Sequence, residues 1–425
     1  MNDKKVISVY AHWQGFIEPC HMGNLTVTHV KGKDAFSFNY TDQWLKSGFS
    51  QMLDPDLQMY PGQYYPKDEK INFGLFLDSC PDRWGRMLMD RREAAIARQG
   101  KKQSRHLTES DYLLGVFDGH RMGGLRFKLN GEGDFLNNNE TFASPPFTSL
   151  RELENASLKY EGDNINDKNY LRWINLLINP GSSLGGARPK AGVVDPKGQL
   201  WIAKFPSIND DKNVGAWEMV LNTLAKNAGL STVESNIKQF NSKNHTYLSK
   251  RFDRNARGER IHFSSALTLL GQTDGAGSDT GVSYIDMANF IIQRGSNTNA
   301  DLEELWRRIV FNISVKNTDD HLRNHGFLLS DNGWKLSPAF DMNPNEYGQG
   351  LSLNISEKDN ALDLNLALSV SETFRVEPAK ADQIINQVIQ AVSKWKRTAT
   401  LYGIPKSEQE RMKSAFESNG CLIDY

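Results

Sequence analysis

The sequence has few cysteines, no long apolar run and almost no net charge. Its 425 residues include three cysteines, Cys20, Cys80 and Cys421. They stand too far apart along the chain to form a metal cluster, and an odd, scattered set is typical of a reducing compartment. No stretch approaches the roughly 18 apolar residues of a membrane span, and the first residues lack the apolar core of a secretory signal. We therefore expect a cytoplasmic protein that makes no membrane contact.

The charge balance excludes a partner recognised by bulk electrostatics. Lysine and arginine number 50, against 51 aspartates and glutamates. Such a chain has no net field that would favour nucleic acid, an anionic membrane or an acidic protein. Short basic runs such as Arg91–Arg92 and Lys101–Lys102 are interpreted as solvated faces.

The pattern of apolar residues predicts an α+β chain. Residues 4–40 alternate apolar and polar positions between glycine-containing turns, which is typical of a small antiparallel sheet. A stretch rich in Asn, Gly and Pro at 130–146 indicates a boundary, and the pattern after Phe263 is mostly helical. We predict three consecutive domains: a β-rich subdomain at 1–145, a lobe with a glycine-rich loop at 146–255 and a mostly helical lobe at 256–425.

Residues 311–342 contain an acid, an amide, a hairpin and a second acid. Asp319 precedes Asn324 by five positions, and the turn sequence Asp-Asn-Gly at 331–333 separates two short apolar runs that lead to Asp341. Phosphoryl transfer from ATP needs a carboxylate at the attacking hydroxyl and oxygen ligands for magnesium. The spacing matches the protein-kinase catalytic loop. Asp319 would orient or deprotonate the acceptor, and Asn324 and Asp341 would bind Mg²⁺.

Two other interpretations of this stretch stay open. The loop could be a polar helix end followed by a buried strand end, because Asp and Asn often cap helices and turns. His321 and His325 stand four apart, as zinc ligands on one helical face do. The zinc-protease motif, however, needs Glu directly after the first His, where this chain has Leu322.

A glycine-rich turn and a strand lysine precede this stretch. Gly185 and Gly186 would let the backbone approach a phosphate closely, and Lys204 lies on a predicted strand. A Walker A loop is excluded, because Ala187 and Arg188 replace its Lys and Ser/Thr.

A helix and a hinge complete the predicted site. Asn213 is expected to cap a helix from Val214 to about residue 227, which carries Glu218. A strand lysine followed by a helix glutamate is the kinase arrangement in which Lys grips the phosphates and Glu orients it. Residues 246–254 would form a strand and then the hinge that receives adenine. The order of these parts predicts a bilobal ATP site.

With these residues in hand, the sequence resembles the HipA family of bacterial serine/threonine kinases, the toxin halves of HipBA toxin–antitoxin modules. GGARPKAG, WIAKFPS, RFDR, NTDDHLRNHGFL and SPAFDM are similar to its kinase motifs. VISVYAHWQGFIE, FLDSCPDRWGRMLMDRR and YLLGVFDGHRMGGLRF resemble stretches of its N-terminal part. The resemblance implies a bilobal, protein-kinase-like fold and a protein serine/threonine kinase that uses ATP and Mg²⁺.

The resemblance also assigns roles by position. Lys204 matches the ATP-binding lysine, and Asp319 the catalytic aspartate. Ser183, or its neighbour Ser182, matches the serine that family members phosphorylate on themselves, which would place a dianion in the glycine-rich loop. Asp320 stands where a small residue is common and is expected to alter the charge near the acceptor. The residues assigned to the nucleotide are Gly185, Gly186, Ala187, Lys190, Lys204, Glu218, Arg251, Phe252 and His321.

Partners and substrate follow from the resemblance alone. It implies a HipB-like helix-turn-helix antitoxin, with DNA contacted through that antitoxin, and a protein substrate, for which a tRNA synthetase is the best-known target class. Two alternatives stay open: a small-molecule kinase on the same fold, and a catalytically silent corepressor that holds an antitoxin on DNA.

Overall fold

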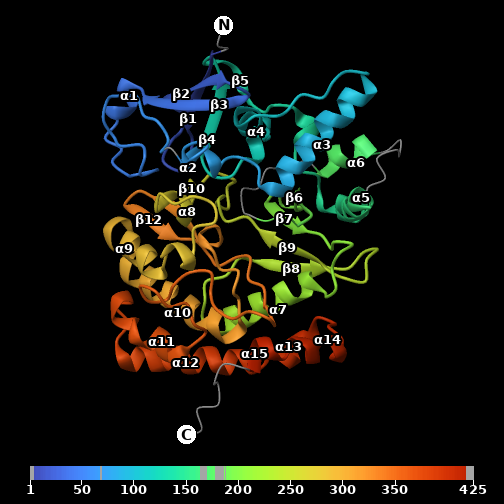
Figure 1. Cartoon of the computed structure of the whole chain (residues 1–425), viewed down its shortest axis with the longest axis vertical. Helices are drawn as coiled ribbons and strands as arrows, with labels where there is room; N and C mark the ends of the chain where they lie inside the picture. The colour runs from blue at the N-terminus through green and yellow to red at the C-terminus, as the bar shows by residue number, and fades with distance from the viewer. Residues whose placement is uncertain (1–3, 68, 163–169, 178–185, 187, 418–425) are drawn as a thin grey trace. The chain divides into compact units, whose positions relative to one another are not determined.

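The computed structural model describes residues 4–67, 69–162, 170–177, 186 and 188–417, and it divides into two units (Figure 1). The first unit comprises Met1–Ile208 and Lys250–Thr273, and the second comprises Asn209–Ser249 and Asp274–Tyr425. This division differs from the three consecutive ranges that composition suggested, because the chain returns to the first unit at residues 250–273.

The first unit contains a five-stranded antiparallel sheet in the order β3-β2-β1-β4-β5. The first three strands form where the alternating pattern predicted them. The strands are β1 (Lys4–Ala11), β2 (Cys20–Val30), β3 (Lys33–Tyr40), β4 (Leu125–Leu129) and β5 (Glu132–Leu136).

Aromatic side chains form the core beneath this sheet. Phe38, Phe76 and Phe127 are fully buried, with ring centroids 5.5 Å apart for the first two and 6.2 Å apart for the last two. Burying each ring contributes about 1.5–3 kcal/mol to folding. The alternation of apolar and polar residues along the strands therefore explains which face of the sheet packs against the aromatic core.

The rest of the first unit consists of helices, a hairpin and the short strand β10. Helix α3 begins after Asp82, whose side chain accepts a hydrogen bond from the Gly85 amide. The elements are α1 (Asp42–Leu45), α2 (Gly74–Leu77), α3 (Arg83–Gln99), α4 (Glu109–Gly115), α5 (Leu150–Glu161), α6 (Tyr170–Leu177), β6 (Lys190–Val194), β7 (Leu200–Lys204), β10 (Phe263–Ser265) and α8 (Ala266–Leu269).

The second unit is mostly helical. Asn213 caps α7 through a hydrogen bond from the Ala216 amide to its side chain, as the sequence predicted. The elements are α7 (Val214–Asn227), β8 (Ser235–Lys238), β9 (Thr246–Lys250), α9 (Tyr284–Arg294), α10 (Thr298–Val315), β11 (Gly326–Ser330), β12 (Gly333–Leu336), α11 (Leu364–Ser369), α12 (Pro378–Val392), α13 (Trp395–Leu401), α14 (Lys406–Met412) and α15 (Ser414–Glu417).

Helix α10 is the central element of this unit. Its last eleven residues, 305–315, are all buried, which is typical of a helix covered on every side. Helix α12 packs against both α10 and α7, and α13 packs against α7 (Figure 1). Because α10 is buried in this way, it fixes the position of the loop that follows its C-terminus.

The predicted hairpin forms after the acid–amide loop. Strands β11 and β12 are antiparallel, with Ser330 opposite Gly333 and a two-residue connection between them. In the part of the chain that the structure describes, no helix has both the length and the apolarity needed to cross a bilayer.

Candidate functional site

The acid–amide loop begins directly at the end of the buried helix α10. Lys316 caps the helix with φ +47°, a left-handed conformation that turns the chain away from the helix axis. Asp319 follows three residues later with an exposed side chain, whereas Asp320 beside it is buried. The loop therefore presents one carboxylate to solvent and withdraws the next.

Asn324 is positioned by a hydrogen bond within the loop. Its side-chain nitrogen Nδ2 donates to the backbone carbonyl of Asp319 at 2.8 Å. This bond fixes the amide orientation and leaves Oδ1 buried, with no hydrogen-bond partner among the described residues. A buried carbonyl oxygen without a donor is costly unless a ligand or ion completes it. Asn324 therefore fits the predicted role of cation ligand.

Asp341 lies in an unusual backbone conformation. It is half-buried, and its φ is +57°, which is uncommon for a residue other than glycine. Its carboxylate lies within electrostatic range of Asp319. Residues in this region of φ cluster at functional sites, where the surrounding structure holds them in place.

The environment of Asp319 favours its protonated form. Partial desolvation raises the pKa of Asp319 above its ordinary value, and the carboxylates of Asp341 and Asp320 act in the same direction. His321 opposes them. Two neighbouring carboxylates such as those of Asp319 and Asp341, each of which favours protonation of the other, also attract a divalent cation.

These residues suit magnesium better than zinc. Mg²⁺ takes oxygen ligands, and it is usually held by one or two protein groups together with substrate phosphates. Asn324 and Asp341 match that set. Among the residues that the structure describes, no group of three or more His, Cys, Asp and Glu side chains is arranged to hold a metal. His325, the second half of the zinc interpretation, uses Nε2 to contact Asp320 at 2.9 Å.

Asp320 acts on the charge at Asp319 and also has a structural role inside the protein. Its Oδ2 lies 2.5 Å from the Tyr284 hydroxyl, 2.6 Å from Asn312 Nδ2 and 2.9 Å from His325 Nε2. Burial acts to raise the pKa of Asp320, but His325 and these hydrogen bonds bring it below the ordinary value. The carboxylate therefore fixes the loop from within the protein, which the sequence did not predict.

The hydrogen bonds continue from Asp320 to the segment after Asp341. Asn312 accepts a hydrogen bond from Asn317 Nδ2 at 3.0 Å, and Asn317 accepts one from the backbone amide of Asn343 at 3.1 Å. One polar network thus joins helix α10, the acid–amide loop and the chain that carries Asp341. Such networks orient site residues that they do not include.

We expect Asp320→Ala to destabilise the protein by about 3 kcal/mol, because three buried donors would lose their acceptor. Urea unfolding measures this change, with Asp382→Ala on the exposed face of α12 as the control. Because the folded-state pKa is below the unfolded value, Asp320 contributes stability at neutral pH that is lost on acidification below about pH 4. Equal midpoints for the two variants would show that the network contributes nothing.

The first unit gathers two lysines at one end of a hairpin. Lys190 and Lys204 lie directly opposite each other across β6 and β7. Lys190 is buried and forms a 2.8 Å ion pair with Asp82. Gly186 has φ +95°, and a Cβ added to it would lie 3.4 Å from the Lys190 ammonium. The hairpin thus brings two lysine positions together, and Asp82 supplies a negative charge to one of them.

Some predicted site residues stay predictions. Ser182, Ser183, Gly185 and Ala187 lie outside the described residues. Lys204 belongs to the first unit, whereas Glu218, which is buried on α7, and the acid–amide loop belong to the second. Their convergence on one nucleotide is therefore part of the proposal below.

The side chain of Arg251, which is predicted to bind the nucleotide, contacts groups of the first unit. Its buried guanidinium donates to both carboxylate oxygens of Asp253, at 2.8 and 2.6 Å, and to the carbonyls of His120 and Arg121. Asp253 also accepts from the Gly123 amide. The RFDR motif thus holds the glycine-containing loop at 118–124 inside the first unit.

Phe252 and His321 are compatible with their predicted roles. Phe252 is half-buried, with its ring 5.9 Å from that of Phe263. His321 is half-buried beside Asp319, and its Nδ1 is buried without a partner among the described residues.

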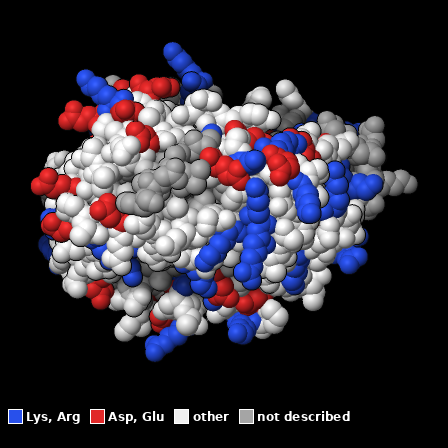
Figure 2. Space-filling view, turned by 90° about the horizontal axis from the view of Figure 1, so that it is seen from below, with Lys and Arg blue, Asp and Glu red and all other residues white. Residues whose placement is uncertain are grey.

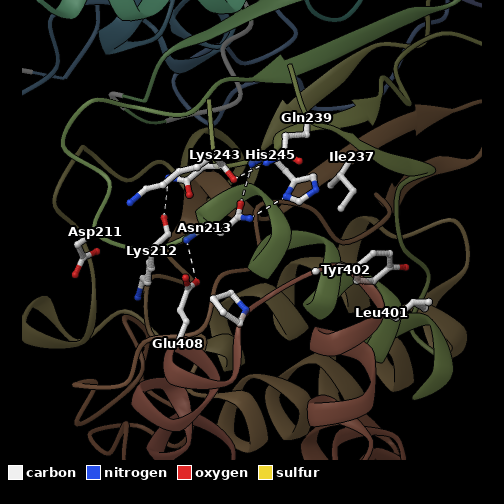
Figure 3. Close-up of a pocket in the computed structure, with 13 residues that line it drawn as sticks. Asp211, Lys212, Asn213, Ile237, Gln239, Lys243, His245, Leu401, Tyr402 and Glu408 are labelled. Carbon is white, nitrogen blue, oxygen red and sulfur yellow. Dashed lines mark hydrogen bonds between the residues drawn. The ribbon is translucent and has the colours of Figure 1, made fainter. Parts of the chain in front are cut away.

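A separate pocket of about 650 Å³ lies in the second unit (Figure 3). The segment before α7, the β8–β9 hairpin and the turn between α13 and α14 line it. Asn213 Nδ2 lies 2.8 Å from His245 Nδ1, and the backbone amide of Asn213 donates to the Glu408 carboxylate at 2.9 Å (Figure 3). Glu408 therefore already accepts a hydrogen bond from the backbone at the start of α7. Lys212, at the edge of this pocket, pairs with Glu346 at 2.7 Å.

Comparison with known proteins identifies related sequences and folds. A family model described as the HipA-like C-terminal domain matches residues 182–395, slightly more than half of the chain. A Haemophilus influenzae protein named "Putative kinase" is 27% identical over 183 residues, which cover 38% of this chain. The chain spans about half the length of that relative, 52%.

Solved structures show the fold more completely. The HipA, HipB and operator DNA complex of the Shewanella oneidensis MR-1 toxin–antitoxin system contains a chain that matches with a TM-score of 0.63 and 17% identity, covering 96% of this chain and 94% of that one. The Helicobacter pylori proinflammatory kinase CtkA matches with a TM-score of 0.34 and 15% identity, covering 50% of this chain and 94% of its own. The first likeness is one of fold and confirms the predicted fold class.

Proposed function

The chain belongs to the family defined by the HipA-like C-terminal domain, and from this premise we propose that it is an ATP- and Mg²⁺-dependent protein serine/threonine kinase. The resemblance seen in the sequence motifs is confirmed for the family. One observation carries the proposal further. Asn324 donates to the backbone carbonyl of Asp319 and keeps its Oδ1 buried with no hydrogen-bond partner among the described residues, and the exposed carboxylate of Asp319 lies within electrostatic range of Asp341.

The residues divide the chemistry among them. Asn324 and Asp341 would hold magnesium, which when bound neutralises charge on the transferring phosphoryl group. Asp319 would orient the acceptor hydroxyl and accept its proton, and its raised pKa makes it a better proton acceptor than an ordinary Asp. Lys204 would pair with the phosphates, oriented by Glu218. The mechanism depends on positioning and electrostatics, without a covalent intermediate.

The proposal extends to regulation and to partners. Phosphorylation of Ser183 or Ser182 would add a dianion where ATP phosphates must bind, and would shut the enzyme down. The Shewanella complex contains HipB and operator DNA, which supports a HipB-like antitoxin as partner. A protein substrate, with a tRNA synthetase as one candidate class, follows from the resemblance.

Direct DNA binding by this chain is not part of the proposal. Basic side chains gather along one part of the face that carries the C-terminal helices, with acidic ones between them (Figure 2). Lys396 on α13 and Lys413, directly before α15, both pair with Glu417, at 2.8 and 3.5 Å. We interpret this face as solvated, and DNA would be contacted through the antitoxin.

Incubation with γ-labelled ATP and Mg²⁺ tests the proposal. We expect label on the protein, located by mass spectrometry at Ser183 or Ser182. Label in a soluble metabolite would instead favour a small-molecule kinase. Failure to bind Mg-ATP would favour the catalytically silent corepressor.

A further inference from the structure

The segment at residues 345–352 is fixed to the acid–amide loop by three hydrogen bonds. The Asn345 amide donates to the Lys316 carbonyl at 3.0 Å, and Asn345 Nδ2 donates to Thr318 Oγ1 at 2.8 Å. The Ser352 hydroxyl donates to the Thr318 carbonyl at 2.7 Å. Both ends of the segment therefore contact the residue next to Asp319.

The segment is also held from its buried side. Glu346 is 8% exposed, and its carboxylate pairs with Lys212 at 2.7 Å, at the edge of the pocket in Figure 3. Its carbonyl accepts from the Ser414 hydroxyl at 3.0 Å. The residue before Tyr347 is thus anchored in the protein by side chain and backbone.

Glycine at position 348 allows the close approach to the catalytic loop. A Cβ added there would lie 2.5 Å from Thr318 Cγ2 and 2.8 Å from Thr318 Oγ1. No side chain could occupy this position unless Thr318 moved. The backbone of the segment therefore lies directly against the residue that precedes Asp319.

Tyr347 projects outward from this anchored backbone. It is 75% exposed, and its amide donates to Asn345 Oδ1 at 3.1 Å. A single exposed aromatic residue is ordinary on a protein surface. Tyr347 differs because the residues on both sides of it are fixed, and because Asn345 and Gly348 lie against Thr318. An aromatic side chain on a fixed backbone loses less conformational entropy on binding a partner than one on a mobile loop.

We propose that residues 345–352, with Tyr347 at their centre, are the docking surface for the polypeptide segment that carries the acceptor hydroxyl. The inference rests on the proposed function and names the substrate class of that site. Residues 347–352, Tyr-Gly-Gln-Gly-Leu-Ser, carry no charge, and the one charged residue of the segment, Glu346, is buried and paired with Lys212. The surface therefore fits a substrate with an apolar or aromatic side chain close to its Ser or Thr, rather than a basic or acidic one.

An arrayed peptide library with a fixed central Ser or Thr, incubated with labelled Mg-ATP, tests this proposal. We expect the wild type to prefer a large apolar residue within about two positions of the hydroxyl. Tyr347→Ala should raise KM for the preferred peptide about 10-fold with little change in kcat, and Tyr347→Phe should keep most of the affinity. Leu401→Ala is the matched control, because Leu401 is 74% exposed in the same unit and lines the pocket elsewhere.

Three results would contradict either the docking surface or the proposed function. An unchanged KM and unchanged preference in Tyr347→Ala would overturn the inference. So would a wild type that binds Mg-ATP and labels itself but labels no peptide, and that result would leave the proposed function standing. A wild type that does not bind Mg-ATP would overturn the proposed function itself.

Discussion

Replacing Asp319 with alanine is expected to reduce phosphate transfer by about 10³-fold or more while the protein stays folded and binds ATP. The loss follows because general-base and orienting carboxylates contribute about 10²–10⁴-fold. Stability should change little, since the Asp319 side chain is exposed and the fixing hydrogen bonds belong to its neighbour Asp320. Autophosphorylation rate, urea midpoint and ATP affinity would be measured on the same preparation.

The control for this experiment is a second exposed aspartate. Asp382→Ala on α12 removes the same carboxylate from a surface that has no part in the site, and it should retain the full rate. If Asp319→Ala transfers phosphate as fast as the wild type, Asp319 is not the catalytic residue. If Asp319→Ala instead unfolds at a lower urea concentration than the wild type, the exposed side chain has a structural role that its contacts do not indicate.

Asp341→Asn is expected to weaken magnesium-dependent ATP binding by more than about 100-fold. In comparable metal sites, removing a residue that hydrogen-bonds to a metal ligand already lowers metal affinity about 10- to 100-fold. Removing the charge of a ligand itself should lower it more. Asparagine is the informative substitution because it tolerates φ near +57°, so the change removes charge and leaves the backbone unstrained. Alanine would mix the two effects.

Asp331→Asn is the matched control for Asp341→Asn. Asp331 lies exposed in the turn between β11 and β12, where asparagine is equally suitable. Titration with ATP in the presence and absence of Mg²⁺ separates the roles. An Asp341→Asn protein that keeps the magnesium dependence of the wild type would contradict the assignment of Asp341 as a ligand.

The parts of this molecule that the sequence predicted depend on local chemistry. Asn213 caps its helix because a side chain two or three residues from free amides can reach them. The Asp331–Asn332 turn joins two strands because these residues accept the required backbone conformation. The fold of residues 4–40 follows from an alternating pattern visible in one stretch. Each of these signals lies within a few residues of its effect.

The parts that the sequence did not predict depend on contacts between distant residues. The structural role of Asp320 depends on donors such as the Tyr284 hydroxyl, which lies 36 positions earlier. The hydrogen bond from Arg251 to the His120 carbonyl joins residues 131 positions apart. The return of residues 250–273 to the first unit is likewise marked by no change in composition. The spacing of residues along the chain does not indicate which distant residues contact each other.

A crystal structure of the protein with Mg²⁺ and a non-hydrolysable ATP analogue would show whether these residues meet at one nucleotide. We expect one metal bound by Asn324 Oδ1 and the Asp341 carboxylate, Lys204 on the phosphates, and the terminal phosphate facing Asp319. A nucleotide bound elsewhere, or at this site with Asn324 and Asp341 away from the metal, would contradict this expectation.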